Sequence, residues 1–349
     1  MKVLVTGAAG LLGQYVCRRL LARGDHVFAV DSLSRFRMFG ESRAQPRPDF
    51  AAIDCGFPMG ARCDFFEASF YDPEILSFVA EGGAEAIVHC AAQTSHPRSI
   101  AIPLEDCEVN ALGTLRLLEA IRKAPATRLV NISSCKIYDM KCNPDDLVQN
   151  DTRIEPRYYP FVNKDVLVGE RRPLGGLITP FGVSKLAADL YVRNFSVLYD
   201  LDACSIRPGC FTGPQSLAVE LQNWAPMLTR AMVRGETFSV FGYGGKQVRD
   251  LLHVDDLARL VLACIDHIPA WRGEAFNACG GVGRDISILE AVDLIERLTG
   301  KRGELHFEPA RAADWAWFIG DNSKAESVLG WRPEIDIESI FKQLCAEVA

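Results

Sequence analysis

The chain has 349 residues, 48% of them hydrophobic and 24% charged, which is the balance of a globular protein with one large or two ordinary domains. The net charge of −7 at pH 7 excludes a general nucleic-acid binder, because there is no basic excess to neutralise phosphates. No apolar run is long enough to span a bilayer, and the first residues lead directly into a strand pattern rather than a signal peptide. We therefore expect a cytoplasmic protein without a membrane or nucleic-acid partner.

The twelve cysteines are scattered singly along the chain, without a C-x-x-C pair. Buried thiols in a reducing cytoplasm are the expected state for such a pattern. No group of histidine, cysteine and carboxylate residues has the spacing of metal ligands, so no metal is predicted.

Strand patterns that are apolar throughout alternate with amphipathic helix patterns in the first half of the chain. We expect strands over residues 2–7, 26–31, 84–92 and 127–134 and helices over 11–24, 110–124 and 180–200. Strands that are apolar on both faces and are joined by helices predict an α/β fold with a doubly wound parallel sheet of the Rossmann type.

Two structural units are predicted. Residues 1–205, including helix 180–200, form the Rossmann domain. Residues 206–349 mainly form a smaller α/β substrate lobe over the carboxyl ends of the strands, with two or three helices after residue 256, and a return of the chain to the first domain stays open. Substrate specificity is expected in the irregular segment 140–180 and in segment 215–228.

Three glycines stand directly between the first strand and the first helix. Gly7 permits a tight turn, Gly10 lets the backbone approach a pyrophosphate, and Gly13 lets the helix pack closely on the sheet. The start of the helix at Leu11 and Leu12 then faces the negative charge of the phosphates. The position of this trio between a strand and a helix predicts a dinucleotide site.

Asp31 ends the second predicted strand, eighteen residues after Gly13. A carboxylate there accepts hydrogen bonds from the adenosine ribose hydroxyls and repels a 2′-phosphate, which favours NAD over NADP. Arg35 lies nearby in the sequence and weakens that preference. A turn-capping aspartate is the alternative interpretation of Asp31.

Five further segments carry a resemblance to a known family: "VHCAAQ", "NISSCKIY", "FGVSK", "GKQVRDLLHVDD" and "SVLGWRP". Together with the glycine motif they resemble the extended short-chain dehydrogenase/reductase family, from Met1 to about Pro333. NAD-dependent sugar-nucleotide epimerases and dehydratases belong to that family. Within it, the lysine in "CKIY" and the segment before "TPFGVSK" resemble most the CDP-paratose (CDP-tyvelose) 2-epimerase group.

The resemblance implies a set of NAD-binding residues. Ala91 and Ala92 match small residues that pass beneath the cofactor, and Asn110 matches an asparagine of the following helix. Ser69 stands where the family has an aspartate near the adenine, followed by Phe70. The full set is Gly7, Gly10, Leu11, Leu12, Gly13, Asp31, Ser69, Phe70, Ala91, Ala92, Asn110 and Lys185.

The resemblance also implies the groups that meet a nucleotide-diphospho-sugar substrate. Ser134 matches the residue that hydrogen-bonds the reacting sugar hydroxyl, and Gln93 is placed at the substrate. Arg249 and Arg311 match arginines that hold the diphosphate. Lys185 matches the lysine that binds the nicotinamide ribose and lowers the pKa of a catalytic tyrosine.

That tyrosine is replaced here, because Phe181 occupies its position in "TPFGVSK". Phenylalanine keeps the ring but cannot move a proton, and the loss of a general base costs about a hundredfold to ten-thousandfold in rate. Three interpretations stay open: an engineered Tyr→Phe form, a natural phenylalanine with another proton carrier, or binding without turnover. The candidate carriers are Tyr138, Cys135, Lys136 and Cys210, each of which also has a structural interpretation as a core, buried-thiol or surface residue.

The expected reaction is epimerisation at C2 or C4 through a transient keto-sugar and NADH. A dehydratase is the alternative enzyme, although Cys135 and Lys136 stand where the resembled dehydratases have an Asp-Glu pair. An inactive NAD- or nucleotide-binding protein is the alternative outside enzymes. The apolar faces of helices 104–124 and 180–200 predict a homodimer, because the equivalent helices form an intersubunit bundle in the resembled family.

Overall fold

The computed structural model describes residues 1–34, 62–139, 147–157, 166–176, 178–216, 223–267, 270–311 and 314–348. Arg35 lies outside these residues. So do parts of the two segments that were expected to set substrate specificity, namely residues 140–146, 158–165, 177 and 217–222.

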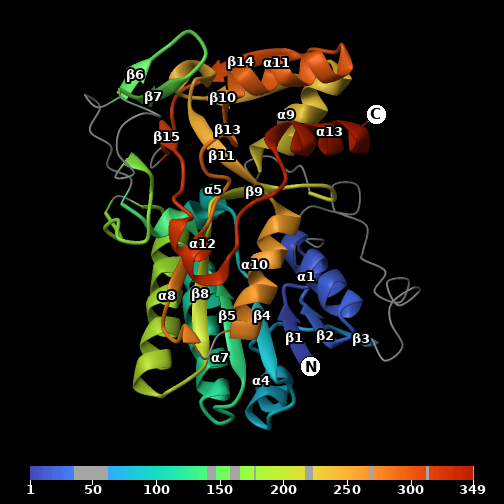
Figure 1. Ribbon diagram of the computed structural model, residues 1–349, viewed down its shortest axis with the longest axis vertical. Coiled ribbons are helices and arrows are strands. Elements are labelled where there is room, and N and C mark those ends of the chain that lie inside the picture. Colours follow the sequence, from blue (N-terminus) through green and yellow to red (C-terminus); the bar gives the residue numbers. More distant parts are fainter. Residues whose placement is uncertain are drawn as a thin grey trace.

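A parallel sheet of seven strands forms the centre of the larger domain, in the order β12-β8-β5-β4-β1-β2-β3 (Figure 1). This order reverses between β1 and β4, which is the switch point at which doubly wound sheets bind their ligands. The strands are β1 (Lys2–Thr6), β2 (His26–Asp31), β3 (Arg62–Glu67), β4 (Ala86–His89), β5 (Arg128–Ile132), β8 (Ala203–Pro208) and β12 (Ala275–Ala278).

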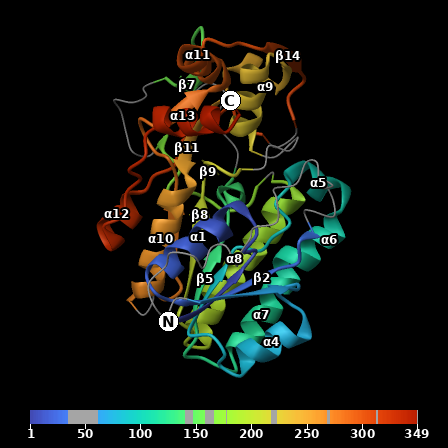
Figure 2. The same cartoon turned by 90° about the vertical axis from the view of Figure 1, so that its right-hand side faces the viewer.

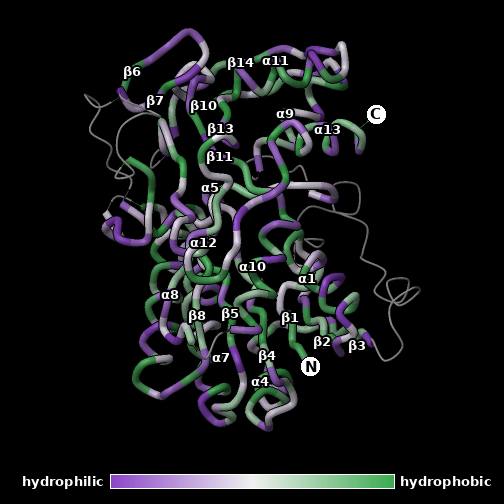
Figure 3. The backbone as a smooth tube through the Cα atoms, viewed as in Figure 1, coloured by the Kyte–Doolittle hydropathy of each residue, from purple (hydrophilic) through white to green (hydrophobic). Residues whose placement is uncertain are grey.

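Helices cover both faces of this sheet, as Figure 2 shows. On one face, α1 (Leu11–Ala22) and α10 (Val254–His267) enclose a core with β1, β4 and β5. On the other face, the residues of α4 (Pro73–Ala80), α7 (Gly113–Ile121) and α8 (Pro180–Leu198) form a second core. The central residues of β1 and β4 are hydrophobic, whereas the helices alternate between hydrophilic and hydrophobic residues (Figure 3).

A smaller lobe lies beyond the carboxyl ends of the strands, at the top of Figure 1. Its apolar core joins α9 (Trp224–Arg234), α11 (Ile288–Thr299) and α13 (Ile337–Val348). Its small sheets pair β10 with β14, and β11 with β9, β13 and β15. Their bounds are β9 (Cys210–Thr212), β10 (Thr237–Phe241), β11 (Val248–His253), β13 (Asp285–Ser287), β14 (Glu304–Glu308) and β15 (Trp317–Phe318).

The remaining described elements are shorter. They are α5 (His96–Ala101), α6 (Pro103–Cys107), a π-helical turn (Glu108–Leu112), 3₁₀ turns (Cys135–Ile137 and Tyr243–Gly245), β6 (Leu147–Gln149), β7 (Ile154–Pro156) and α12 (Ser323–Leu329).

The doubly wound sheet is confirmed, and each expected strand and helix is present. Helix 110–124 begins as the π-helical turn before it continues as α7. The part after residue 254 contains four described helices, where two or three were expected after residue 256. α10 and β12 return from the second half of the chain to the large sheet.

Candidate active site

The glycine motif forms a close-packed turn between β1 and α1. Gly7 has a φ of +69°, and a Cβ added there would stand 2.6 Å from the backbone nitrogen of Ala91. A Cβ on Gly13 would stand 2.2 Å from the carbonyl oxygen of Gly7. Gly10, which precedes α1, has no side chain to cap the first N–H groups of the helix, at Leu11 and Leu12. This geometry fits an anion such as a pyrophosphate.

Asp31 is fixed at the end of β2 by two backbone donors. The N–H of Ala9 lies 3.0 Å from Oδ2, and the N–H of Leu33 lies 2.8 Å from Oδ1. The carboxylate therefore stands beside the glycine turn, as the NAD prediction requires. Its contact with Leu33 also shows the turn-capping role that was the alternative interpretation.

The loop after β4 packs against the glycine turn. Ala91 packs against Gly7, and its N–H lies 3.3 Å from the hydroxyl oxygen of Thr6. In the segment that follows β3, the N–H of Ser69 donates to the Asp72 carboxylate. The ring of Phe70 is buried, and its centroid lies 4.5 Å from that of the His89 imidazole. Phe70 is thus held in the core.

A buried polar network ties this loop to helix α8. The backbone N–H of Gln93 donates to Asn110 Oδ1 at 2.9 Å, and the side-chain amide of Asn110 donates to the Gln93 carbonyl at 3.0 Å. The side-chain amide of Gln93 donates to Asp106 at 2.7 Å, and Ser184 donates to Asp106 at 2.5 Å. The amide of Asn110 also lies 3.1 Å from Ser184 Oγ. Gln93, predicted to bind substrate, is therefore engaged inside the protein, where it positions the loop.

Ser134 and Lys185 stand at the carboxyl end of β5. Ser134 begins the turn Cys135–Ile137, and its Oγ accepts the Lys136 N–H at 3.2 Å. Lys185 on α8 is buried and donates from Nζ to the Ile132 carbonyl at 2.8 Å. Burial lowers the pKa of Lys185 to about 8, so part of the population is neutral near physiological pH.

Phe181 lies one turn before Lys185 on α8 and is buried. Its backbone N–H donates to Ser99 Oγ at 3.1 Å. Its ring meets the imidazole of His96 edge to face, with 4.5 Å between the ring centroids. The position of the missing phenol is thus bordered by an imidazole that was not singled out from the sequence.

The structure separates Tyr138 from solvent. It is fully buried, its hydroxyl donates to Asn277 Oδ1 at 2.6 Å, and it accepts from Arg207 at 3.2 Å. Burial raises the pKa of Tyr138. Arg207 is in turn paired with Asp189 of α8, so Tyr138 belongs to an internal network that favours a structural role.

The two cysteine candidates are neutral thiols. Burial raises the pKa of Cys135 to about 11 and that of Cys210 to about 12. A thiol with such a pKa carries very little thiolate at neutral pH and is a poor base.

A compact charged cluster joins the two parts of the protein. Arg249 of β11 lies 2.8 Å from Asp314, and Lys136 Nζ lies 3.7 Å from the same carboxylate oxygen. Burial would raise the pKa of Asp314, but Arg249 and Lys136 outweigh it and lower that pKa to about 2. The cluster carries two cations and one anion, and its excess positive charge suits an anionic ligand. Arg311 lies on the same lobe, with its guanidinium over the ring of Phe241.

Several residues of this site were not predicted from the sequence. Asp106, Ser184 and Asp314 become recognisable only when separate elements meet. His96 carried a weak signal, because it follows the "AAQ" segment at the carboxyl end of β4, where ligands of such sheets bind.

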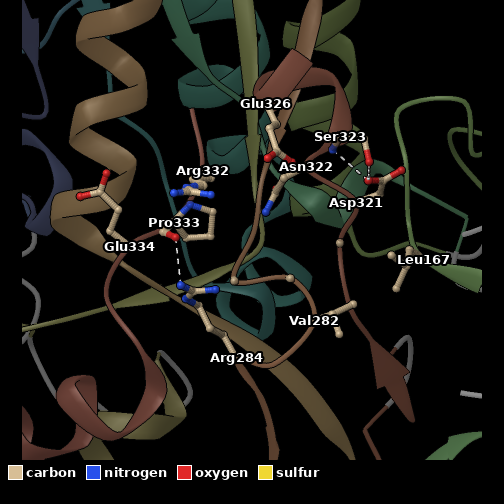
Figure 4. A pocket seen from close by; sticks show the side chains of 13 residues that line it. Leu167, Val282, Arg284, Asp321, Asn322, Ser323, Glu326, Arg332, Pro333 and Glu334 are labelled. Atoms are coloured by element: carbon tan, nitrogen blue, oxygen red, sulfur yellow. Dashed lines mark hydrogen bonds between the residues drawn. The ribbon is translucent and has the colours of Figure 1, made fainter. Parts of the chain in front are cut away.

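A surface hollow of about 510 Å³ lies between α12 and the loop that follows β12 (Figure 4). Arg284 and Arg332 line it, and Arg284 donates to the carbonyl of Pro333. None of the residues predicted to bind cofactor or substrate is among its lining residues.

Among the described residues, no group of three or more histidine, cysteine and acidic side chains is placed to hold a metal ion. The ten cysteines in the described ranges are free. Of the helices that the structure describes, none has the length and apolar character needed to cross a membrane.

The fold and these residues define a class: a dinucleotide-binding α/β protein with a carboxylate beside its glycine turn and a charged cluster that joins it to a second lobe. The chain belongs to the NAD dependent epimerase/dehydratase family, whose model matches residues 3–279. It is 31% identical over 344 residues to UDP-glucose 4-epimerase of Mycolicibacterium smegmatis, covering 98% of this chain and 97% of that protein. It is 27% identical over 342 residues to CDP-paratose 2-epimerase of Salmonella typhi, covering 96% and 95%.

Solved structures agree with this assignment. UDP-glucose-4-epimerase from Stenotrophomonas maltophila, with bound NAD and formylated UDP-arabinopyranose, matches with a TM-score of 0.80 and 26% identity over 99% of this chain and 97% of that one. UDP-glucose 4-epimerase of Thermotoga maritima with UDP-glucose matches with a TM-score of 0.77 and 26% identity over 100% and 98%. The predicted family is therefore confirmed, and these homologues are nucleotide-sugar epimerases with inversion at C2 and C4 both represented.

Proposed function

We propose that this protein is an NAD-dependent epimerase of a nucleotide-diphospho-sugar, which inverts C2 or C4 through a transient keto-sugar. The observation that carries the proposal is the meeting, at one sheet edge, of the glycine turn, Ser134 and Lys185 with the cationic cluster around Arg249. Each of these groups has a use in binding or oxidising a sugar nucleotide. The family and the epimerase relatives support the same reaction class.

The residues present fit NAD. The turn leaves no room for a side chain at Gly7 or Gly13, and α1 begins without a side-chain cap, so its N–H groups are directed at the pyrophosphate. Asp31 holds the adenosine ribose and disfavours a 2′-phosphate. When bound, NAD supplies the acceptance and later return of a hydride at the sugar carbon. Lys185 is placed on α8 to hold the nicotinamide ribose.

The chain's own groups bind and orient the sugar nucleotide. Arg249 holds the diphosphate, and for this its guanidinium exchanges some of the bonds that Nη1 donates to the Val248 carbonyl and Nη2 donates to Asp314 and the Trp315 carbonyl. Lys136 adds a second cation to the same place. Ser134 hydrogen-bonds the reacting hydroxyl, and Arg311 of the second lobe holds the diphosphate together with Arg249.

Two alternatives are weaker. A dehydratase requires an acid and a base beside Ser134, whereas the next two residues are Cys135, a neutral thiol, and Lys136, a cation. A protein that binds its ligands without turnover does not require a buried lysine with a lowered pKa. Lys185 is such a lysine, which favours an enzyme over a binding protein.

We also propose a homodimer in a reducing, cytoplasmic compartment. An exposed apolar stripe runs along α8 through Val183, Leu190 and Val197, at helical spacing, and Leu104 is 82% exposed on the neighbouring α6. A second copy that packs its own α8 there would cover these residues. Light scattering should give a dimer mass that Leu190→Arg converts to a monomer, whereas an unchanged monomer mass for the parent protein contradicts the dimer.

The test of the function compares this protein with its Phe181→Tyr variant. Both are incubated with CDP-, UDP-, GDP- and dTDP-sugars, products are identified by NMR, and bound NAD is quantified after denaturation. We expect an epimer from at least one nucleotide-sugar and NAD in the purified protein. Eliminated water in the product would show a dehydratase, and no product from either variant would refute the proposed function.

A further inference from the structure

The proposed function leaves one step without a carrier, because the ring at Phe181 has no oxygen to accept the hydroxyl proton. The four candidates named from the sequence are poorly suited, and one of them, Lys136, forms an ion pair with Asp314. Tyr138 is sealed in the core by Asn277 and Arg207, and the thiols of Cys135 and Cys210 are neutral. A different side chain has to face the reacting hydroxyl.

His96 is the group that the structure places against the Phe181 ring. It is the first residue of α5, at the carboxyl edge of β4, and its imidazole lies edge to face with the Phe181 ring at 4.5 Å. It is only partly buried, in contrast to the sealed Tyr138. We propose that His96 is the proton-transfer residue of this enzyme in place of the tyrosine phenol, which rests on the proposed epimerase function.

The hydrogen bonds of the imidazole leave one nitrogen for the substrate. Nδ1 lies 3.5 Å from the hydroxyl oxygen of Thr179, the residue that caps α8. In the described parts of the chain, Nε2 has no hydrogen-bond partner. With the proton on Nδ1 directed at Thr179, Nε2 carries the lone pair that a base needs.

The charges around His96 link its basicity to substrate binding. Burial, followed by the positive charge of Lys136, lowers the pKa of His96 to about 3, and Asp314 opposes this. α8 presents Phe181 and Thr179 to the imidazole, and neither is charged. A substrate diphosphate bound at Lys136 offsets the cation, which is the second of the two causes after burial, and therefore raises the pKa of His96 above its value in the free protein. The imidazole is thus a stronger base in the complex than in the free protein.

The proton and electron balance of the step is complete. The O–H bond of the sugar carbinol breaks and its proton forms an N–H bond at Nε2, while the C–H electron pair leaves as hydride to the oxidised nicotinamide. A carbonyl forms at that carbon. After the sugar presents its other face, the hydride returns and the imidazolium gives its proton back to the oxygen, so no further reagent is consumed.

The decisive experiment combines four variants with the substrate identified by NMR. His96→Gln and His96→Phe should lower kcat about a hundredfold to ten-thousandfold with little change in KM, since the base is lost and the binding groups remain. His96→Phe keeps an aromatic ring against Phe181, and retained NAD content and melting temperature report folding. The double variant H96Q/F181Y should regain turnover through the restored phenol. Exposed His306→Gln is the matched control and should match the parent.

A second readout does not depend on turnover. The imidazole signals of isotope-labelled histidines are titrated with pH in the NAD-loaded protein, with and without UDP or CDP, and His96 is assigned by its loss in His96→Gln. We expect the pKa of His96 to rise by more than one unit with the nucleotide diphosphate. A pKa that does not change, or His96→Gln turning over like the parent, overturns the proposal.

The outcomes also separate the two proposals. If Phe181→Tyr turns over and the parent protein does not, the epimerase site is real and His96 is not its proton carrier. If neither turns over any nucleotide-sugar, the epimerase function fails, and the role of His96 fails with it.

Discussion

Replacing Gly13 by alanine tests the cofactor site with the least chemical change. The new Cβ would stand 2.2 Å from the Gly7 carbonyl oxygen and 2.7 Å from the Ala8 Cα, both rigid backbone atoms. Ordinary contact needs more than 3.4 Å, so α1 has to move away from the turn by about 1 Å. Overpacking of this kind lowers the free energy of unfolding by about 1–3 kcal/mol.

The same displacement carries the N–H groups of α1 away from the phosphates. A hydrogen bond to a charged group contributes about 1.5–3 kcal/mol. Losing one such bond therefore weakens NAD binding about 10- to 150-fold. Gly10→Ala should have a smaller effect, because its Cβ would stand 3.1 Å from the Gly7 oxygen.

Gly24→Ala is the matched control, because Gly24 lies just beyond the other end of α1. A Cβ there meets no atom within 4 Å, but the φ of +87° costs an alanine about 1–2 kcal/mol. Urea denaturation of the NAD-free variants measures stability, and calorimetric titration with NAD measures affinity. Gly24→Ala should lose stability alone. If Gly13→Ala binds NAD as tightly as Gly24→Ala does, the turn is not the pyrophosphate site.

Three further changes probe the buried charges. Asp189→Asn leaves Arg207 unpaired inside the protein, so urea denaturation should show a loss of about 3–5 kcal/mol; a loss below 1 kcal/mol contradicts this. Lys185→Met should weaken NAD retention, measured as cofactor content after gel filtration, and an unchanged content argues against its ribose contact. Burial raises the pKa of Asp250 to about 7, so the folded state holds a proton that the unfolded chain releases near pH 4. Asp250 therefore contributes its full stabilisation below pH 4, and about 2–4 kcal/mol of it is lost as the pH rises from 4 to 7. The unfolding free energies of the parent protein and of Asp250→Asn are measured by urea denaturation across this pH range. The parent should lose that stability as the pH rises, and Asp250→Asn should not.

The fold could be predicted because its signals are local. A strand such as 26–31 has an apolar centre, and the spacing of Gly7, Gly10 and Gly13 fixes a turn within a few residues. The π-helical turn at 108–112 was not predicted, because its sequence has an ordinary helical pattern. The turn is tied from Asn110 to the distant loop at Gln93.

The sequence predicts site residues from single motifs, and it does not reveal contacts that join several elements. Tyr138 ends a strand pattern that fits either a core or a site residue, and only its bonds to Asn277 and Arg207 show the buried arrangement. His96 is a lone histidine before a proline, with no periodic pattern around it. Its contact with Phe181 joins residues 85 positions apart, which no local signal encodes.

The anchoring of α8 explains why the absence of one oxygen need not disturb the site. The helix is held by the Ser184 bond to Asp106, by Lys185 on the Ile132 carbonyl and by the Phe181 N–H on Ser99, none of which involves the ring at position 181. A tyrosine at 181 would therefore start from the same backbone position, which makes its rescue of a His96 variant a test of chemistry rather than of folding. Because the Phe181 ring is fixed, an imidazole packed against it is held in one orientation without further loss of backbone conformational entropy. A proton-transfer residue requires such preorganisation.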